Sequence, residues 1–506
     1  MRALQEKERK YDVGKRFRLP DFADALAGEV RVVRRAPADL DAVYFDTDDL
    51  RLLQAGVTLR RRSGGSDAGW HLKLPSPARE TRTEVQLPLD AGSPTEVPGE
   101  LVDLVSARTR GRQLRPIARL RTSRGVTSLV GADGAGSVEV AEDEVDAEVL
   151  RNGKHTAWRE IEAEVGANGG GLAKRVDKLL RQAGARVSPE SSKLATALAK
   201  PRIRAPGPAV SSKSPREVLR RFLAEQTEAL LAQDVEVRRG ELDDAVHDMR
   251  VAARRLRSCL RTFAPMFESA QAAKLERELQ WLSGLLGAVR DAQVLRAHMA
   301  LSVGSLAPTG SVASVGEDLD HVIGERLRLA RNELGAGLRS ERYRELLNEL
   351  VDFAARPAYR GGARPHRRRL RRLVEKEIRR TRRRVVMGRR SSGEGRDHAL
   401  HQARKSAKRT RYAAETVSPL WPKCARRLAR RFERLQQLLG DRHDAVIARS
   451  LLREHELHAV SPSPEGTAAA FSYGILIGQE EARIAVVDDA LARMREHVRH
   501  SNSLKG

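Results

Sequence analysis

Hydrophobic and polar residues alternate along many short segments of the first 200 residues, and this alternation predicts β-strands. Turn residues separate the segments, and helical stretches are expected near residues 20–27, 97–108, 172–182 and 192–199. Many short strands at this spacing are typical of an antiparallel sheet that closes into a barrel. The predicted strands are residues 6–10, 30–34, 42–46, 58–62, 70–74, 82–87, 117–122, 126–130, 137–141, 144–150 and 156–165.

The pattern changes after a segment rich in proline, glycine and serine. Residues 201–214 have the composition of an interdomain linker, and from 215 to 500 leucine and alanine recur at helical spacing among arginine and glutamate. The sequence therefore predicts a multidomain α+β and all-α protein. Its N-terminal domain, residues 1–200, is the β-barrel with flanking helices, and residues 215–500 form a helical domain.

The helical part repeats internally. The motif His247-Asp-Met-Arg250 aligns with His401-Gln-Ala-Arg404 at an offset of 401 − 247 = 154. The pattern Leu-x-x-Leu-Leu-Gly-x-x-x-Asp ends at Asp291 and again at Asp444, at an offset of 444 − 291 = 153. Two matched motifs at nearly one offset predict a duplicated four-helix bundle, with halves at about 215–345 and 365–500. The Ser/Gly/Val-rich segment 302–316 is expected to be a loop.

The charge of the chain is uneven and points to a polyanionic partner. Of the 506 residues, 1–200 hold 34 Lys+Arg and 30 Asp+Glu, whereas 201–506 hold 59 and 38, a net charge of +4 against +21. Such a field attracts nucleic acid, polyphosphate or an acidic membrane surface. Aromatic residues make up only 4% of the chain, which leaves few platforms for base stacking and makes nucleic acid an unfavoured partner except through non-specific charge.

No stretch of the sequence predicts a signal peptide or a membrane-spanning helix. The start, MRALQEKERK, has no apolar run, and nowhere do 18 apolar residues follow one another. The basic helical faces adjoin apolar faces suited to bundle cores, which disfavours membrane binding. We therefore expect a cytoplasmic protein.

Charged residues recur on single faces of the predicted strands, because side chains two apart point the same way. One such row is typical of a solvated surface. Several rows of both signs in one domain instead favour an interior that holds a phosphate anion beside a divalent metal ion, since carboxylates bind the ion and Lys or Arg binds the phosphate. The rows are Glu6/Glu8/Lys10, Arg60/Arg62, Arg82/Glu84, Arg119/Arg121 and Glu160/Glu162/Glu164.

The order of these motifs resembles the CYTH family, the triphosphate tunnel metalloenzymes. The resemblance covers about residues 1–200 and implies an eight-stranded antiparallel tunnel that grips a linear triphosphate. Its motifs here are Glu6-x-Glu8-x-Lys10, Tyr44-Phe-Asp-Thr47, Leu59-Arg-Arg-Arg62, Leu72-Lys73-Leu74 and Trp158-Arg-Glu-Ile-Glu-Ala-Glu164.

The resemblance also implies a role for each matching residue. Glu6, Glu8 and Lys10 would be catalytic. The ligands of Mg²⁺ or Mn²⁺ would be Glu6, Glu8, Glu160, Glu162 and Glu164. The triphosphate-binding residues would be Lys10, Arg60, Arg62, Lys73, Arg82, Arg119, Arg121 and Lys193. The choice among Arg119, Arg121 and Arg124 depends on a register step of one residue, which would reverse the face.

The repeated helices carry matching basic stripes. His247, Arg250, Arg254 and Arg257 step by three, four and three residues and so share one helix face, as do His401, Arg404, Lys408 and Arg411. A single basic stripe is usually a solvated face. Duplication at matched positions, histidines included, favours a shared anion-binding surface.

These helical motifs resemble the CHAD family, the conserved-histidine α-helical domain, over about residues 212–500. The resemblance implies two pseudo-symmetric bundles whose basic groove binds inorganic polyphosphate through His247, Arg250, Arg254, Arg257, His401, Arg404, Lys408 and Arg411.

Together the two parts predict a metal-dependent triphosphatase that hydrolyses tripolyphosphate and binds long-chain polyphosphate. Hydrolysis of a phosphoanhydride needs neutralised phosphoryl oxygens, a metal ion and an oriented water, and the charged rows suit these needs. A non-catalytic polyphosphate-binding protein, and a hydrolase or cyclase acting on thiamine triphosphate or ATP, are the alternatives. The sequence does not decide the number of metal ions, the oligomeric state or the docking of the two domains.

Overall fold

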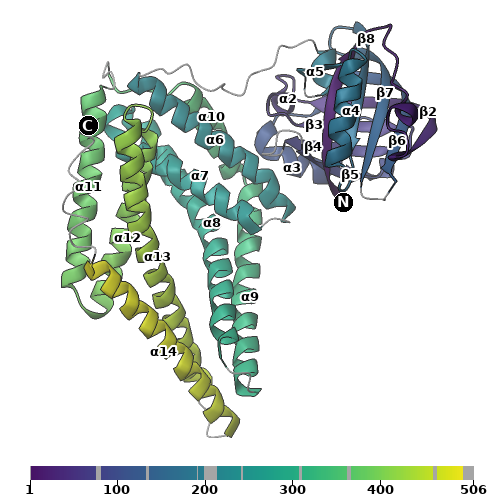
Figure 1. The fold of residues 1–506 in the computed structure, drawn as a ribbon. Helices are drawn as coiled ribbons and strands as arrows, with labels where there is room; N and C mark the ends of the chain where they lie inside the picture. Colours follow the sequence, from purple (N-terminus) through teal and green to yellow (C-terminus); the bar gives the residue numbers. More distant parts are fainter. Residues whose placement is uncertain are drawn as a thin grey trace. The chain divides into compact units, whose positions relative to one another are not determined.

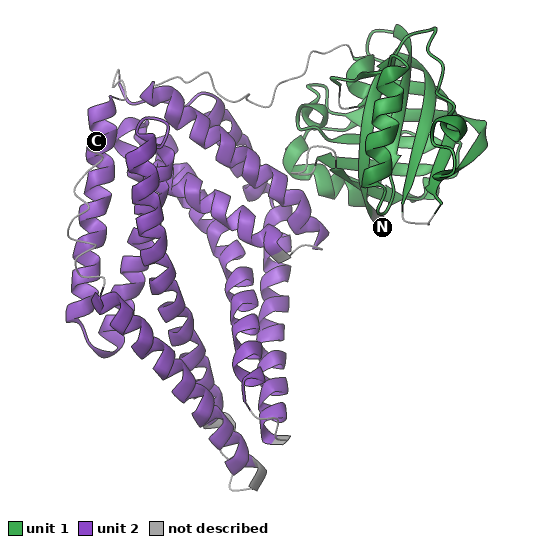
Figure 2. Ribbon diagram, viewed as in Figure 1, with its two compact units in different colours: residues 1–207 green, residues 208–506 purple. Residues whose placement is uncertain are grey.

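The chain forms two compact units, residues 1–207 and 208–506 (Figure 2). The computed structural model describes residues 2–75, 81–132, 136–190, 192–198, 214–240, 243–306, 310–361, 366–459 and 464–493. The predicted linker, 201–214, lies outside these ranges except for Ser214. No described helix is long and apolar enough to cross a membrane.

The first unit is an antiparallel β-barrel of eight strands, which confirms the predicted fold (Figure 1). The sheet order is β5-β4-β3-β2-β6-β7-β8-β1, and pairing of β1 with β5 closes the barrel. A short ninth strand, β9 (Arg186–Val187), adds to β1. The eight strands are β1 (Arg2–Val13), β2 (Val30–Asp46), β3 (Thr58–Ser63), β4 (Gly69–Pro75), β5 (Thr81–Leu87), β6 (Arg115–Gly131), β7 (Ser137–Val149) and β8 (Lys154–Val165).

Three of these strands each join two segments that the sequence predicts as separate strands. The segments 30–34 and 42–46 are the two ends of β2, and an irregularity between Arg35 and Ala38 accommodates Pro37, which cannot donate a ladder hydrogen bond. Similarly, β6 continues through Gly125, and β7 continues through Glu142 and Asp143. Local breaker residues therefore do not end strands that are paired on both sides.

Helices cover the outer face of the barrel and close one end of its interior. Leu172, Val176 and Leu180 of α4 (Gly170–Gln182) pack on Ile161 and neighbouring outward side chains, and full burial of each stabilises the fold by about 1.5–3 kcal/mol. Inside, Leu120 and Val145 pack with Leu194 and Ala197 of α5. The remaining short helices are α1 (Phe22–Ala25), α2 (Arg51–Gln54), η1 (Leu89–Ala91), α3 (Gly99–Thr109) and α5 (Lys193–Ala197).

The second unit is all helical within the described residues, apart from an isolated bridge between Phe267 and Tyr359. Consecutive helices pack on one another in each half, and the two halves meet where α7 contacts α12, α8 contacts α13 and α9 contacts α14. The helices are α6 (Pro215–Arg239), α7 (Asp243–Thr262), η2 (Ala264–Met266), α8 (Ser269–Gly304), α9 (Gly310–Arg339), α10 (Glu341–Ala355), α11 (Arg367–Arg390), α12 (Gly393–Thr416), α13 (Pro422–Ala459) and α14 (Pro464–Arg493).

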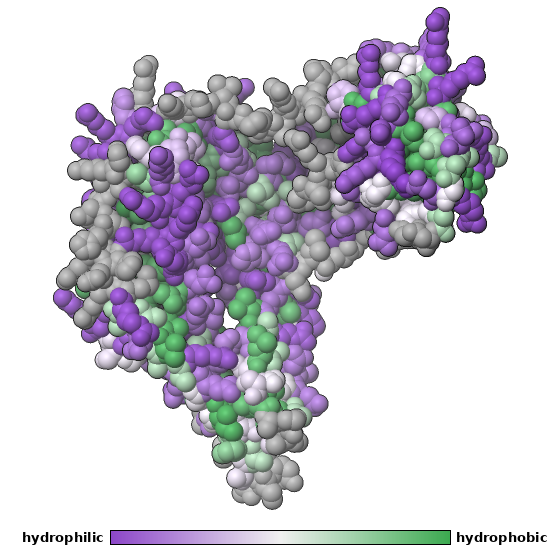
Figure 3. Space-filling model, viewed as in Figure 1, coloured by the Kyte–Doolittle hydropathy of each residue, from purple (hydrophilic) through white to green (hydrophobic). Residues whose placement is uncertain are grey.

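Two features of this unit differ from the sequence prediction. The expected loop 302–316 is mostly helical, because α8 extends to Gly304 and α9 begins at Gly310, while residues 307–309 lie outside the described ranges. The first half also carries α10, which packs on α6, α8 and α9 and has no counterpart among the described helices of the second half. Helices α8, α9, α13 and α14 share a hydrophobic core near the C-terminal ends of α8 and α13 and the N-terminal ends of α9 and α14, in the lower part of Figure 3.

Candidate functional site

The opening strand presents a charged face to the inside of the barrel. Glu6, Glu8 and Lys10 of β1 line an interior cavity. Arg9 points the opposite way and pairs with Asp177 of α4 at 3.0 Å, and Lys7 is exposed. The strand therefore separates its charges by face, as alternation predicts.

The interior cavity has equal numbers of side chains of opposite charge. Its lining includes seven Lys or Arg and seven Asp or Glu, and its free volume is only about 80 Å³ because ion pairs span it. The cations are Lys10, Arg60, Arg62, Lys73, Arg82, Arg124 and Lys193. The acids are Glu6, Glu8, Asp67, Glu84, Glu139, Glu162 and Glu164.

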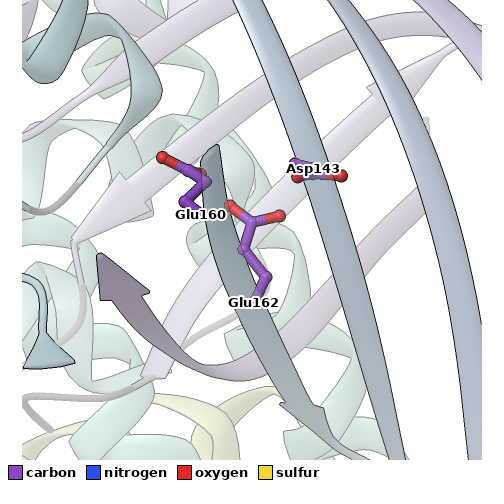
Figure 4. A group of neighbouring side chains, drawn as sticks. All are labelled: Asp143, Glu160 and Glu162. Carbon is purple, nitrogen blue, oxygen red and sulfur yellow. The ribbon is translucent and has the colours of Figure 1, made fainter. Parts of the chain in front are cut away.

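Three carboxylates converge at one place in the barrel: Asp143 of β7 with Glu160 and Glu162 of β8 (Figure 4). One oxygen of each lies within 4.8 Å of the others. Asp143 and Glu160 are buried, and Trp158 Nε1 donates a hydrogen bond to Glu160 at 2.7 Å. This is a compact set of hard oxygen donors.

Lys193 lies against all three carboxylates. Its Nζ is 2.8 Å from Asp143, 2.8 Å from Glu160 and 2.5 Å from Glu162. The side chain of Ser192 accepts a hydrogen bond from the backbone N–H of Ala195 at 3.2 Å, which fixes the start of α5 and so the position of Lys193. The capped start of α5 thus holds Lys193, one of the predicted triphosphate-binding residues, against the three carboxylates.

Neighbouring groups of opposite charge shift the pKa values of Glu162 and Lys193 in the direction that keeps both groups charged. Burial would raise the pKa of Glu162, but Lys193, Arg124 and Lys10 together hold that pKa well below its usual range. Burial would lower the pKa of Lys193, but Glu160, Glu162 and Asp143 raise it well above its usual range. Arg124 donates to Asp143 at 2.6 and 2.8 Å and to Glu162 at 2.5 Å. Glu162 and Lys193 are therefore both charged near neutral pH.

A second acidic set lies along β1 and β5. Lys73 Nζ contacts Glu6 at 2.5 Å, and it lies 3.8 Å from both Glu8 and Glu84. Burial and a hydrogen bond with Glu84 raise the pKa of Glu6 to about 8. The buried ring of His71 contacts Glu84 at 2.6 Å and so fixes that carboxylate. Glu164 is more exposed and lies opposite Glu8 in the register of β1 and β8.

Arg60 and Arg62 of β3 have buried hydrogen-bond donors that lack acceptors among the described residues. The Nε atoms of Arg60 and Arg62 are buried and have no hydrogen-bond acceptor among the described residues. Burial and the neighbouring Arg60 and Arg124 lower the pKa of Arg62 to about 9. Buried donors without acceptors cost free energy, and an anion bound in the cavity would supply acceptors.

The residues present fit a divalent metal ion. Mg²⁺ and Mn²⁺ prefer carboxylate oxygens, and Asp143, Glu160 and Glu162 provide three such groups within one ligand-sized space. Oxygen Oε1 of Glu160 is buried and accepts no hydrogen bond among the described residues, although two ammonium groups lie 2.8 Å away. The acidic group could therefore hold a metal ion.

The sequence prediction is wrong for two of the tunnel arginines. Arg119 pairs with Asp41 at 2.5 Å outside the lining of this cavity, and Arg121 is exposed. Arg124 takes the expected place, because the alternation of β6 turns Leu120, Thr122 and Arg124 inward. Asp143 and Glu84 were also missing from the predicted site.

The helical unit contains a second charged cavity, of about 830 Å³, lined by α7, α8, α11, α12 and α13. The lining includes eleven Lys or Arg, four His and only two Asp. Seven of the predicted residues line it: His247, Arg250, Arg254, Arg257, His401, Arg404 and Lys408. Arg411 does not, because it pairs with Glu415 and Glu433 at 2.8 Å each. Arg411 is therefore not part of this cavity, contrary to the prediction.

The structure explains why both repeated motifs recur together. Arg250 pairs with Asp291 at 3.1 Å, and the equivalent Arg404 lies 3.9 Å from Asp444. The glycine four residues before each aspartate lies beside the guanidinium, since a Cβ at Gly440 would be in ordinary van der Waals contact with Arg404, at 3.5 Å, and one at Gly287 with Arg250, at 3.8 Å. The Leu-Leu-Gly-x-x-x-Asp pattern thus orients one arginine in each half of the cavity.

The second repeat supplies three groups of this cavity whose pKa values lie well below their usual range: His401, His443 and Lys408. The His401 and His443 rings lie 4.2 Å apart, and burial together with neighbouring cations lowers the pKa of His401 to about 4. Burial, followed by Arg254, Arg404 and Arg250, lowers the pKa of Lys408 to about 6. Lys408 has no ion-pair partner among the described residues. The cavity therefore accumulates positive charge that its own carboxylates do not balance.

Both halves of the chain match described domain families. Residues 4–193 match the CYTH domain and residues 221–453 match the CHAD domain. Domains of these two families are associated with triphosphate and polyphosphate binding. The chain belongs to the family of triphosphate-tunnel proteins in which a CYTH domain is followed by a CHAD domain.

The chain is similar to a relative over nearly its whole length and to two solved structures over part of it. The uncharacterized protein MT2285 of Mycobacterium tuberculosis (strain CDC 1551 / Oshkosh) is 34% identical over 521 residues, which cover 97% of this chain and 98% of that one. PptA from Streptomyces chartreusis is 20% identical, with a TM-score of 0.48 over 56% of this chain and 99% of that chain. The CHAD domain from the plant Ricinus communis is 24% identical, with a TM-score of 0.42 over 57% of this chain and 92% of that chain.

Proposed function

We propose that the barrel hydrolyses inorganic tripolyphosphate with Mg²⁺ or Mn²⁺, and that the helical unit binds long-chain polyphosphate. The observation that carries the first part is the interior cavity, where seven cations and seven acids face one another. A metal–triphosphate complex also combines both charges, so the lining is complementary to it.

The cations of the cavity would bind the triphosphate and stabilise its transition state. Arg60, Arg62 and Arg124 offer planar guanidinium groups to phosphoryl oxygens, and Lys10 and Lys73 add point charges. Most catalysis of phosphoryl transfer comes from such positioning and charge neutralisation. A divalent ion held by Asp143, Glu160 and Glu162 would polarise a phosphoryl oxygen.

Glu6 and Glu8 are the carboxylates that β1 offers to a water molecule in the same cavity. Both contact Lys73, so their oxygens are fixed close to a cation that would bind phosphate. A carboxyl group held in this way orients an attacking water. These two residues are therefore the first targets for substitution.

Phosphate release from tripolyphosphate tests the assignment. We expect release that needs Mg²⁺ or Mn²⁺, stops with a chelator, and falls by at least about a hundredfold in Glu6→Gln/Glu8→Gln. Glu142→Gln/Glu144→Gln is the matched control, because these carboxylates also lie two apart on a strand but pair with Arg159 outside the cavity. Undiminished release by the Glu6/Glu8 variant would overturn the assignment.

A substrate panel separates this proposal from its alternatives. Tripolyphosphate, ATP, thiamine triphosphate and long-chain polyphosphate are compared at equal concentration. Faster turnover of ATP or thiamine triphosphate would move the assignment to an organic triphosphate. Tight polyphosphate binding without turnover of any triphosphate would indicate a binding protein.

A further inference from the structure

The two repeats differ sharply on one helix face. The offset of 153 residues places Lys274, Arg277, Glu278 and Trp281 of α8 at the positions of Arg427, Arg430, Arg431 and Arg434 of α13 (427 − 274 = 434 − 281 = 153). A mixed face in the first repeat thus corresponds to four arginines in the second. We call these four residues the arginine surface.

In the first repeat, helix α10 covers this face. Glu349 of α10 pairs with Lys274, and Arg342 Nε contacts Glu278 at 2.6 Å. The guanidinium of Arg342 also lies over the Trp281 ring, 4.3 Å from its centroid. The charged and aromatic groups of α8 therefore have intramolecular partners.

In the second repeat, no described helix takes the place of α10. Arg427, Arg430 and Arg434 are exposed, and Arg431 is half-buried. None of the four has a carboxylate within 4.0 Å in the described part of the chain, and Nη2 of Arg431 is buried without a hydrogen-bond acceptor there. Burial and then the nearby Arg382, Arg434 and Arg427 lower the pKa of Arg431. The arginine surface is thus a concentration of like charge that its surroundings do not neutralise.

This surface is separate from the helical cavity. None of its four arginines lines that cavity, to which α13 contributes Gln436, His443, Asp444 and Ile447. Gln436 follows Arg434 by two positions and so lies on nearly the opposite side of the helix.

We propose that the arginine surface is a second polyanion-binding site and that its ligand is an inorganic polyphosphate chain that extends beyond the helical cavity. The proposal rests on the proposed binding of polyphosphate by the helical unit. The four arginines step by three, one and three residues and span roughly 10 Å of helix, which presents a row of guanidinium forks to a linear row of phosphates.

Substitution of all four arginines by glutamine tests the proposal in the full-length protein. We expect the affinity for long-chain polyphosphate to fall about tenfold, and its salt dependence to weaken, because four charge contacts are lost. Binding of tripolyphosphate and its hydrolysis should not change. Thermal unfolding should match wild type, and the smaller variant Arg430→Glu/Arg434→Glu repeats the test at two exposed positions.

The matched control removes the same charge elsewhere. Arg296, Arg326, Arg328 and Arg453 are exposed, and each has a carboxylate partner, so their substitution by glutamine lowers the net charge equally. An equal loss of affinity in both quadruple variants would overturn the proposal in favour of a general charge effect. Tighter binding of duplex DNA than of polyphosphate, lost only in the arginine-surface variant, would reassign the surface to nucleic acid. A wild-type protein that binds tripolyphosphate but no long-chain polyphosphate would refute the underlying function instead.

Discussion

The two charged cavities of this molecule differ in the balance between positive and negative side chains in their linings. The barrel cavity balances seven cations with seven acids inside about 80 Å³, whereas the helical cavity sets eleven Lys or Arg against two Asp around about 830 Å³. In the barrel, most of the cations already pair with carboxylates, so a ligand has to replace existing ion pairs. In the helical unit, positive charge is left uncompensated, so an anion adds the missing partner. The difference indicates a mixed-charge ligand for the first cavity and a bare polyanion for the second.

Arg124 gives the largest expected effect on the barrel side. Arg124→Gln should lower tripolyphosphate hydrolysis at least about a hundredfold, because it removes a guanidinium from the cavity together with two hydrogen bonds to the buried Asp143. Arg121→Gln, three residues away on the same strand but exposed, should leave the rate unchanged. Phosphate release and thermal unfolding are measured together, and Arg124→Lys separates loss of charge from loss of fold. Equal rates for the two glutamine variants would contradict the inward register of Arg124.

The helical cavity can be disabled independently. Arg250→Gln/Arg404→Gln removes the one arginine in each half that an aspartate orients, and we expect long-chain polyphosphate binding to fall about a hundredfold. Tripolyphosphate hydrolysis should persist. Arg411→Gln is the control, since Arg411 pairs with two glutamates outside the cavity lining. If hydrolysis fell together with binding, the two cavities would not be separate sites.

The uncompensated charge of the helical cavity predicts a pH dependence. With a pKa of about 6, Lys408 is mostly neutral at pH 7.5, and a bound polyanion would favour its charged form, so binding takes up a proton. Arg250 and Arg254 of α7 and Arg404 of α12 oppose the charged form, while Asp291 and Asp444 favour it. Affinity for long-chain polyphosphate should therefore fall from pH 6 to pH 8, by up to about tenfold per unit.

The variant Lys408→Arg tests this linkage, because arginine stays charged across the range. Its affinity should vary less steeply with pH than that of wild type, and calorimetry in buffers of different ionisation enthalpy should show less proton uptake. An unchanged pH slope would assign the linkage to the pair of rings at His401 and His443 instead.

The smallest effect is expected outside both cavities. Arg119 pairs with Asp41, and their side chains are 42% and 33% exposed, so Arg119→Gln should lower the free energy of unfolding by no more than about 1 kcal/mol. The hydrogen bond from Arg119 lowers the pKa of Asp41, so this contribution is present at neutral pH and is lost as acid protonates the carboxylate. Hydrolysis should not change. A clear loss of activity would restore Arg119 to the phosphate site.

Strand alternation predicted most of the barrel site, because a period of two fixes the face once the strand is recognised. It placed Glu6, Glu8 and Lys10 on the inner face of β1, opposite Arg9. It failed at β6, where the segment 117–122 and the segment beginning at 126 were read as separate strands and Arg124 fell between them. Asp143 was lost in the same way, in the gap between segments that are one strand, β7. The continuous pairing that joins these segments depends on partner strands far away in the sequence.

In the helical unit, the internal repeat predicted the cavity better than the stripe did. Positions matched by the offset make equivalent ion pairs in the structure. Arg250 pairs with Asp291 in the first repeat, and Arg404 pairs with Asp444 in the second. The basic stripe wrongly included Arg411 in the predicted site, because helical spacing does not show which arginine pairs with a glutamate of a neighbouring helix. The arginine surface could not be inferred from spacing alone, since its meaning depends on the absence of an α10 equivalent among the described helices.

The position of Lys193 has a consequence for the order in which ligands bind. Its ammonium occupies the space among Asp143, Glu160 and Glu162 that the proposed divalent ion would need, so metal binding is an exchange of one cation for another. A triphosphate that attracts Lys193 makes that exchange easier, and by thermodynamic reciprocity the ion then strengthens binding of the triphosphate. Either ligand alone would leave charges of one sign unpaired inside the barrel. The metal ion and the triphosphate would therefore bind together, and they would replace the ion pairs between the cations and carboxylates of the cavity.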